Sequence, residues 1–162
     1  MQGNPRVLKC LDDALKAELT AINQYFLHSK MCENWGYLRL GAYYRKESIE
    51  EMIHAEKLMN RILFLDGTPN MTDIGPINIG KNVKAQFESD LKLEIDAVHH
   101  LNASIKIATE VGDNASRALF EMILADEEEH VDHIEGTLHA IAETGIENFL
   151  AQQIHKGEED EK

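Results

Sequence analysis

Residues 120–138 read FEMILADEEEHVDHIEGTL and carry the periodicity of a buried helix face. Apolar side chains recur three or four residues apart, as they do along one side of a helix: Phe120, Leu124, Val131, Ile134 and Leu138. Glu127 occupies a position of the same stripe, and His130 follows one turn later. Because a buried carboxylate is costly unless it is paired or bound to a metal ion, the stretch predicts a helix with an internal metal-binding motif.

Three further apolar stripes are each interrupted by one glutamate. Glu51 interrupts the stripe of an earlier helix and is again followed three residues later by a histidine, His54. Glu18 and Glu94 interrupt two more stripes. A single interruption could be a position at the edge of a buried face, but one glutamate on each of four helices needs a common cause. The predicted ligands of one metal centre are therefore Glu18, Glu51, His54, Glu94, Glu127 and His130.

The spacing of the four glutamates predicts that they lie at one height. Glu18 and Glu51 are 33 residues apart, as are Glu94 and Glu127, and the second half repeats the first at an offset of 76 residues. In an antiparallel hairpin, residues equidistant from the turn lie level with each other. Both midpoints fall just before a glycine that ends a predicted helix. Each pair is therefore expected to be level across its hairpin, roughly 25 Å from the turn.

Start and stop signals along the chain predict four long helices and a short one in a single domain of residues 1–162. Asn4 and Pro5 begin the first helix, because asparagine caps helices and proline is accommodated at the first position. Residues 66–81 hold two prolines and three glycines without a helical stripe, which indicates a loop. A charged tail, residues 158–162, is expected to fray. The expected helices cover residues 5–34, 38–65, 83–111, 114–143 and 146–155.

The predicted loop is long enough to cross the whole molecule. Sixteen extended residues reach ~53 Å, whereas a helix of 28 residues is ~42 Å long. The helices on either side of the loop are therefore expected to run parallel, while the other neighbours form antiparallel hairpins. Because no alternating strand pattern competes, the predicted fold class is an all-α four-helix bundle with a long crossover between the second and third helices and a short fifth helix.

Composition excludes several partners and compartments. The formal net charge is −13, from 29 acidic and 16 basic residues, which argues against nucleic acid and an anionic membrane as partners. The chain has no run of ~18 apolar residues and hence no predicted membrane span, and residues 1–10 lack an apolar signal core. Cys10 and Cys32 fall ~33 Å apart on one predicted helix, where they cannot bridge each other. We expect a reduced, cytoplasmic chain.

The predicted ligand set is typical of a pair of divalent metal ions. One glutamate from each of two helices, plus Glu-x-x-His from each of the other two, is the known pattern of di-iron carboxylate bundles. Four carboxylates offset the charge of two divalent ions, with Glu51 and Glu127 as the expected bridges, and each imidazole adds a nitrogen donor. The set favours iron or manganese over a zinc ion held by thiolates.

Five segments resemble bacterioferritins and together span nearly the whole chain: ELTAINQYFLHSKM (18–31), ESIEEMIHAEK (47–57), RILFLDGTPN (61–70), INIG (77–80) and DEEEHVDHIE (126–135). The resemblance implies a ferritin-like fold and a hollow cage of twenty-four subunits that stores iron. It also implies a ferroxidase activity, in which O2 or H2O2 oxidises Fe(II) at the di-iron centre and a ferric mineral forms inside. The acidic balance then has a role, because carboxylates lining a cavity attract cations.

The resemblance further implies a haem b between two subunits, held by one methionine from each. The matching residue is Met52, which follows Glu51 and so points about 100° away from the buried face. A ferredoxin that reduces the mineral through the haem is an implied partner, and a second bacterioferritin subunit type can co-assemble. Some members carry a histidine at position 46 that helps hold an extra iron on the inner wall. This chain has Lys46 at that position but retains Glu50 and Asp126, so the sequence does not decide whether the extra iron site exists.

Other interpretations stay open at this point. A di-iron oxidase or peroxidase without mineral storage uses the same ligands, although the chain lacks the Cys-x-x-Cys of rubrerythrins. A non-catalytic structural cage is disfavoured by the two Glu-x-x-His motifs. Tyr25 is either a core tyrosine or a redox group beside the site. Glu47 is either a further carboxylate near the metals or a solvated side chain.

Overall fold

Five α-helices account for the regular secondary structure of residues 1–155, the part of the chain that the computed structural model describes. The tail of residues 158–162, which was expected to fray, lies outside the described residues. The observed ends of the four long helices fall within one residue of those expected. The helices are α1 (Pro5–Asn34), α2 (Leu38–Phe64), α3 (Val83–Glu110), α4 (Asn114–Thr144) and α5 (Ile146–Ala151).

Side-chain caps and glycines determine where the long helices begin and turn. Asn4 accepts a hydrogen bond from a backbone N–H in the first turn of α1. Asn82 and Asp113 do the same for α3 and α4. Each cap satisfies a donor that the first helical turn leaves unpaired. Gly36 and Gly112, in the two hairpin turns, have φ of 87° and 75°, a conformation that favours glycine.

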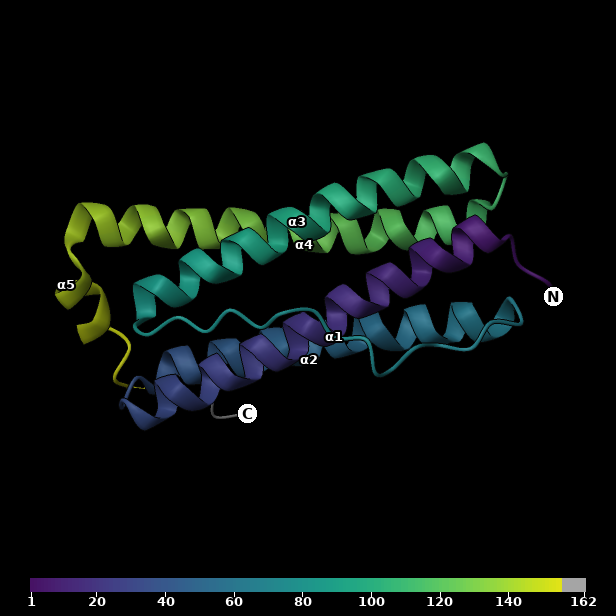
Figure 1. The fold of residues 1–162 in the computed structure, drawn as a ribbon. Helices are drawn as coiled ribbons and strands as arrows, with labels where there is room; N and C mark the ends of the chain where they lie inside the picture. The colour runs from purple at the N-terminus through teal and green to yellow at the C-terminus, as the bar shows by residue number, and fades with distance from the viewer. Residues whose placement is uncertain (156–162) are drawn as a thin grey trace.

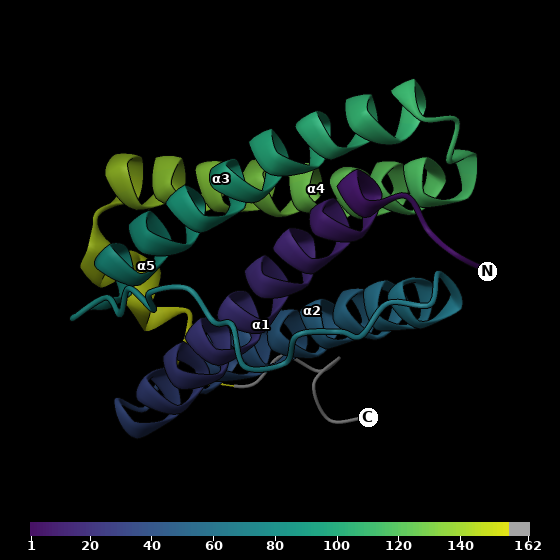
Figure 2. The same cartoon turned by 45° about the vertical axis from the view of Figure 1, so that its right-hand side comes forward.

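The helices form two antiparallel pairs within one bundle (Figure 1). α1 packs along α2, and α3 packs along α4, in both views (Figures 1 and 2). The crossover, residues 65–82, joins α2 to α3 and returns along the length of the bundle, so α2 and α3 run in the same direction. The predicted all-α four-helix bundle with a long crossover and a short fifth helix is confirmed.

A ladder of polar side chains holds the crossover (residues 65–82) against α1. Three acceptors spaced four residues apart on α1 bind backbone N–H groups of the crossover at 2.9, 3.1 and 3.2 Å: Thr20, Gln24 and His28. Asp90 on α3 accepts a hydrogen bond from Gln24 at 2.7 Å and lies 3.1 Å from His28 Nδ1. Because buried backbone N–H groups need partners, this ladder, which the sequence patterns did not predict, determines the path of the crossover.

Two apolar clusters fill the bundle on either side of a polar layer. Burial of each large side chain in them stabilises the fold by roughly 1.5–3 kcal/mol. The first cluster includes Leu11, Leu15, Leu58, Ile62 and Phe120. The second includes Tyr25, Tyr44, Phe87 and Ile134. The predicted metal ligands lie at the boundary between these clusters. Among residues 1–155, none of the helices combines the length and apolarity needed to cross a membrane.

The fifth helix ends earlier than the sequence predicts. α5 closes at Ala151, whereas its expected end was residue 155. The backbone N–H groups of Gln152 and Gln153 bond to carbonyls three residues back, at 3.1 and 2.9 Å, so the chain tightens into turns. The carbonyl of Gln153 then accepts a hydrogen bond from Arg39 N–H at 3.0 Å. This contact with the start of α2 redirects the chain, and local helical pattern could not anticipate it.

Candidate metal centre

The six residues predicted as metal ligands come together in the middle of the bundle, one glutamate from each long helix and one histidine from each of α2 and α4. Every one is buried, and His130 is the most exposed of them at 9%. Their helices place them there because each occupies a core-facing position of an apolar stripe. The residues are Glu18, Glu51, His54, Glu94, Glu127 and His130.

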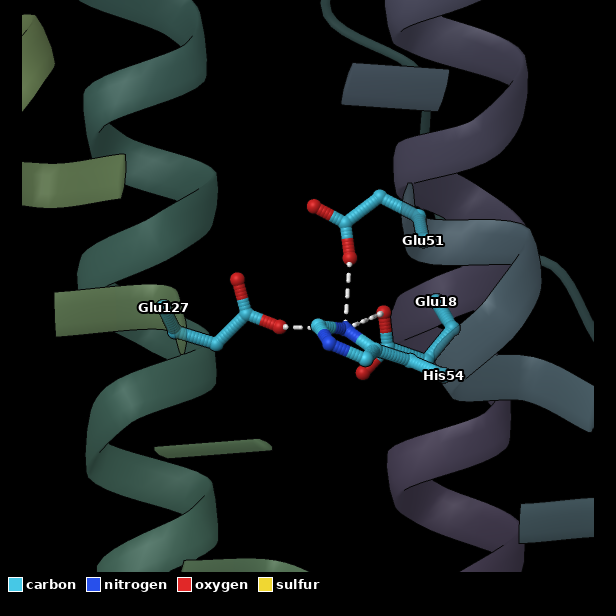
Figure 3. A group of neighbouring side chains, drawn as sticks. All are labelled: Glu18, Glu51, His54 and Glu127. Atoms are coloured by element: carbon cyan, nitrogen blue, oxygen red, sulfur yellow. Dashed lines mark hydrogen bonds and ion pairs between the residues drawn. The ribbon is translucent and has the colours of Figure 1, made fainter. Parts of the chain in front are cut away.

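One half of the centre is built around the imidazole of His54 (Figure 3). Its Nδ1 lies 3.1 Å from Glu51 Oε2 and 3.2 Å from Glu127 Oε1. A carboxylate oxygen of Glu18, from α1, lies 3.7 Å from the same nitrogen. The ligand atoms of these four residues all lie within 4.8 Å of one another, which is close enough for one cation to contact them all.

The other half repeats this arrangement around His130. Its Nδ1 lies 2.9 Å from Glu127 Oε2 and 3.2 Å from Glu51 Oε1. Glu94, from α3, is 3.9 Å away and takes the place that a glutamate of α1 holds in the first half. Again the four ligand atoms lie within 4.8 Å of one another. Glu51 and Glu127 belong to both groups, so two cations would share them.

The residues present fit a pair of divalent cations. Among residues 1–155, Glu51 Oε1 is buried without a hydrogen-bond partner, although His130 Nδ1 lies 3.2 Å away as an ion-pair neighbour. A buried carboxylate oxygen without a partner is costly, and a metal ion would satisfy it. Carboxylates and imidazoles are the donors that iron and manganese accept.

Without metal, protons balance part of the negative charge of the centre. Burial alone would lower the pKa of His130, but the carboxylates of Glu127 and Glu51 raise it to about 12. The pKa of His54 is raised in the same way, against the effect of burial. Burial would raise the pKa of Glu51, but the two imidazoles lower it to about 2. The metal-free centre is therefore held together by cationic imidazoles between carboxylates.

The two unshared glutamates behave differently from the shared pair. Burial, and then the charge of Glu51, raise the pKa values of Glu18 and Glu94 well above the ordinary range. The phenol of Tyr25 donates a hydrogen bond to Glu94. Burial, followed by the charge of Glu94, raises the pKa of Tyr25 well above 10, so this phenol keeps its proton. Tyr25 is thus both a core side chain and a direct partner of a predicted ligand.

Carboxylates also face the outer nitrogens of the two imidazoles. His54 Nε2 lies 3.0 Å from Asp126 Oδ2. His130 Nε2 lies 3.3 Å from Glu47 Oε2 and 3.5 Å from Glu50 Oε2. The alternative of a solvated Glu47 is wrong, since its side chain is buried, and burial raises its pKa to about 7.

From the sequence, a position of Glu47 near the metals was only one of two alternatives, and the contact of Asp126 with His54 was not predicted, although a signal for that contact was present. The 76-residue repeat that relates the two histidines also relates Glu50 to Asp126. Both residues line a cavity of about 220 Å³ that opens onto the two imidazoles, together with Ile53, Lys57 and Glu129. The cavity connects the buried ligands with the protein surface.

Met52, the predicted haem ligand, lies away from the metal centre. Its side chain is 52% exposed on α2. Ile49 and Ile53, one helical turn before it and one residue after it, are also exposed. Exposed apolar side chains that line one side of a helix mark a surface for another molecule, because water contacts are unfavourable for them.

Comparisons with known proteins agree with this architecture. Residues 8–144 match the family of ferritin-like domains. The protein BfrA, a bacterioferritin of Mycobacterium tuberculosis strain H37Rv, is 48% identical over 156 residues, which cover 96% of this chain and 98% of that protein. A bacterioferritin of Brucella melitensis is 48% identical over 149 residues, 92% of each chain. That of Streptomyces coelicolor is 42% identical over 160 residues, 99% of this chain and 96% of the other.

The matches extend over nearly the whole length of the chain and its relatives, and they include both halves of the repeat that builds the centre. Identity of this extent and level requires a common fold and a common ancestor. The chain belongs to the bacterioferritin family of ferritin-like proteins.

Proposed function

We propose that this iron-storage protein is a ferroxidase, which oxidises Fe(II) at a di-iron centre within each chain for deposition as a ferric mineral. The observation that carries the proposal is the pair of overlapping carboxylate–histidine groups that share Glu51 and Glu127. Two ions held by shared carboxylates are close enough to deliver two electrons to one oxidant. In the reaction two Fe(II) become two Fe(III), and the oxidant takes both electrons with two protons, so that O2 forms H2O2 and H2O2 forms two molecules of water.

The residues of the chain bind and orient, while the iron pair supplies the redox chemistry when bound. Glu51 and Glu127 would hold both ions, and each histidine would offer Nδ1 to one of them. Glu18 and Glu94 would complete the two positions from α1 and α3. The phenol of Tyr25 holds the carboxylate of Glu94 in place through its hydrogen bond.

The cage is the second part of the proposal. Family membership gives a homo-oligomeric iron-storage assembly, and we propose twenty-four copies in the cytoplasm, with carboxylates of the acidic chain facing the mineral. Such a particle has a mass of about 440 kDa, twenty-four times 18.3 kDa. A monomer or dimer in light scattering would contradict mineral storage and favour a di-iron oxidase or peroxidase.

A haem b between two subunits is the third part. The thioether of Met52 would hold the haem iron together with that of a second copy, because it is exposed on an apolar stretch of α2 rather than packed in the core. When bound, the haem would supply a path for electrons from a ferredoxin to the mineral. A cage with a second bacterioferritin subunit type would use the same surface.

The ferroxidase proposal is tested by adding Fe(II) aerobically to the metal-free assembled protein and following ferric absorbance. Glu94→Ala and Glu127→Ala should each abolish the fast phase, since one removes a ligand of one position and the other a ligand of both. The matched control is Glu128→Ala, an exposed neighbour on α4. Equal fast phases in the wild type and both ligand variants would reject the centre.

A further inference from the structure

The outer nitrogens of the two imidazoles are held by carboxylates from the opposite helix. His54 on α2 is bonded at Nε2 to Asp126 on α4, at 3.0 Å. His130 on α4 faces Glu47 and Glu50 on α2, at 3.3 and 3.5 Å. These contacts cross the bundle directly from α2 to α4, whereas each helix packs mainly against its hairpin partner.

The internal repeat of the chain is imperfect at this point. Its offset of 76 residues relates Glu50 to Asp126, but it relates Glu47 to Ile123. Ile123 is fully buried and apolar, and it packs in the first core cluster. Within residues 1–155, His54 Nε2 therefore has one carboxylate partner, whereas His130 Nε2 has two.

The number of outer partners matters because a neutral imidazole has one N–H and one lone pair. A metal ion takes the lone pair, so the other nitrogen must carry the proton. A carboxylate at that N–H determines the tautomer, fixes the plane of the ring and makes the ligand nitrogen more basic. Loss of a sole outer partner should weaken the metal position, whereas loss of one of two should be tolerated.

We infer that Asp126 is the positioning residue of one of the two metal positions. It holds His54 with Nε2–H outward and Nδ1 toward the carboxylates of that position, and the other position does not depend on it. This inference rests on the proposed di-iron centre. The position concerned is formed by Glu18, Glu51, His54 and Glu127.

Negative charge at the cavity mouth offers a competing explanation for any effect of Asp126. Asp126 is about half exposed, with 48% of its side chain accessible, and could act only by attracting cations. Glu129 lines the same cavity. It forms no hydrogen bond or ion pair with either imidazole within the part of the chain described here. Glu129→Ala therefore removes the same charge from the mouth without touching the positioning contact.

The experiment is a titration of the metal-free assembled protein with Co(II), followed by the visible absorption of the bound ion. Co(II) does not undergo the Fe(II) oxidation step, so affinity is measured apart from activity. The wild type should bind two ions per chain.

Asp126→Ala should weaken the binding of one of these ions by about 10–100-fold and alter its absorption spectrum. Asp126→Asn should stay within about threefold of the wild type, because its amide oxygen still accepts the N–H. Glu129→Ala should match the wild type.

Two backgrounds identify which position is affected. Glu94→Ala leaves the metal position of His54 intact. In this background, adding Asp126→Ala should lower the Co(II) affinity by the full factor of about 10–100. Glu18→Ala leaves the position of His130 intact, and there Asp126→Ala should change the affinity by less than about threefold.

Several outcomes would overturn the inference while leaving the proposed function standing. One is that Asp126→Ala binds two Co(II) with the affinity of the wild type. Another is that Asp126→Ala weakens Co(II) binding equally in the Glu94→Ala and Glu18→Ala backgrounds. A third is that Glu129→Ala weakens binding as much as Asp126→Ala does. A loss in Asp126→Asn as large as in Asp126→Ala would also overturn it, since charge rather than an acceptor would then be required. A wild-type protein that fails to bind two Co(II) per chain would instead reject the di-iron centre, and this inference with it.

Discussion

At the scale of single residues, the imidazoles of His54 and His130 offset part of the negative charge of the centre. Each lies between carboxylates that raise its pKa, against the opposing effect of burial. For His130 the pKa rises from 6.5 to about 12, so the stabilisation that it gives to the metal-free fold is complete below pH 6.5 and is lost as pH rises toward 12. At neutral pH the metal-free centre thus holds protons that an incoming ion must displace.

This proton occupancy predicts the pH dependence of metal binding. Each Co(II) should displace at least one proton, because a ligand nitrogen must be deprotonated. The affinity should therefore fall by about tenfold per pH unit, for each proton released, as pH is lowered from 7. Calorimetric titration in buffers of different ionisation enthalpy measures the protons released. An affinity independent of pH between 5.5 and 7 would contradict the charge assignment.

At the scale of structural elements, the crossover depends on α1 rather than on its own sequence. Acceptors on α1 bind its backbone N–H groups, and Asp90 on α3 orients two of these acceptors, Gln24 and His28. All three side chains are almost completely buried. The ladder ties α1, α3 and the crossover together, and it keeps α2 and α3 parallel.

The ladder predicts a stability effect for Asp90→Ala. Its removal leaves the buried donors of Gln24 and His28 without partners, at a cost of about 1–3 kcal/mol for each group. The midpoint of thermal unfolding of the assembled protein should fall by several degrees, as followed by circular dichroism. Glu88→Ala is the matched control, since Glu88 is exposed and its one ion pair within residues 1–155 is with Lys84, at 3.6 Å. Equal midpoints in the two variants would show that the ladder does not stabilise the fold.

Two glycines give a second prediction at this scale. A Cβ on Gly80 would lie 2.1 Å from the backbone nitrogen of Gln86, so the crossover could not approach α3 as it does. Gly80→Ala should therefore lower the unfolding midpoint strongly or prevent assembly.

A Cβ on Gly136, within α4, would meet nothing within 4 Å. Gly136→Ala should stabilise the chain by about 0.5–1 kcal/mol, because alanine favours helix more than glycine does. Parallel thermal melts compare the two variants.

At the scale of the whole molecule, the exposed apolar side chains of α2 are unexplained by a single chain. Met52 is 52% exposed, beside exposed isoleucines. An assembly in which this surface meets a second copy removes it from water, at about 25 cal/mol for each Å² of apolar surface buried. The six predicted metal ligands, by contrast, all come from one chain. Binding of iron and binding of haem are therefore expected to separate experimentally.

Met52→Leu should abolish the Soret absorbance of haem in the purified cage, because leucine has no donor atom for the iron. The particle size and the fast phase of Fe(II) oxidation should match the wild type, since Met52 is not one of the buried ligands. Met71→Leu, at an exposed methionine of the crossover, is the matched control. A Soret band that persists unchanged in Met52→Leu would reject this residue as the haem ligand.

The four long helices, their order and the six residues gathered at the centre could all be predicted from the sequence. Because each helix buries one face, its apolar residues recur with a period of 3.6 in the sequence. A glutamate at one of these apolar positions is therefore easy to recognise. The 33-residue spacing placed Glu18 level with Glu51, and Glu94 level with Glu127. These are properties of single helices and of hairpins with known turns.

Contacts between segments that are not hairpin neighbours became apparent only from the folded chain. The bond from His54 to Asp126, the burial of Glu47 beside His130, and the ladder under the crossover each join segments far apart in the chain. The early end of α5 has the same origin, since its last turns are held by the start of α2. The partner of a polar side chain depends on which residues the packing of the helices brings within hydrogen-bonding distance. Hydrophobic periodicity does not predict that pairing.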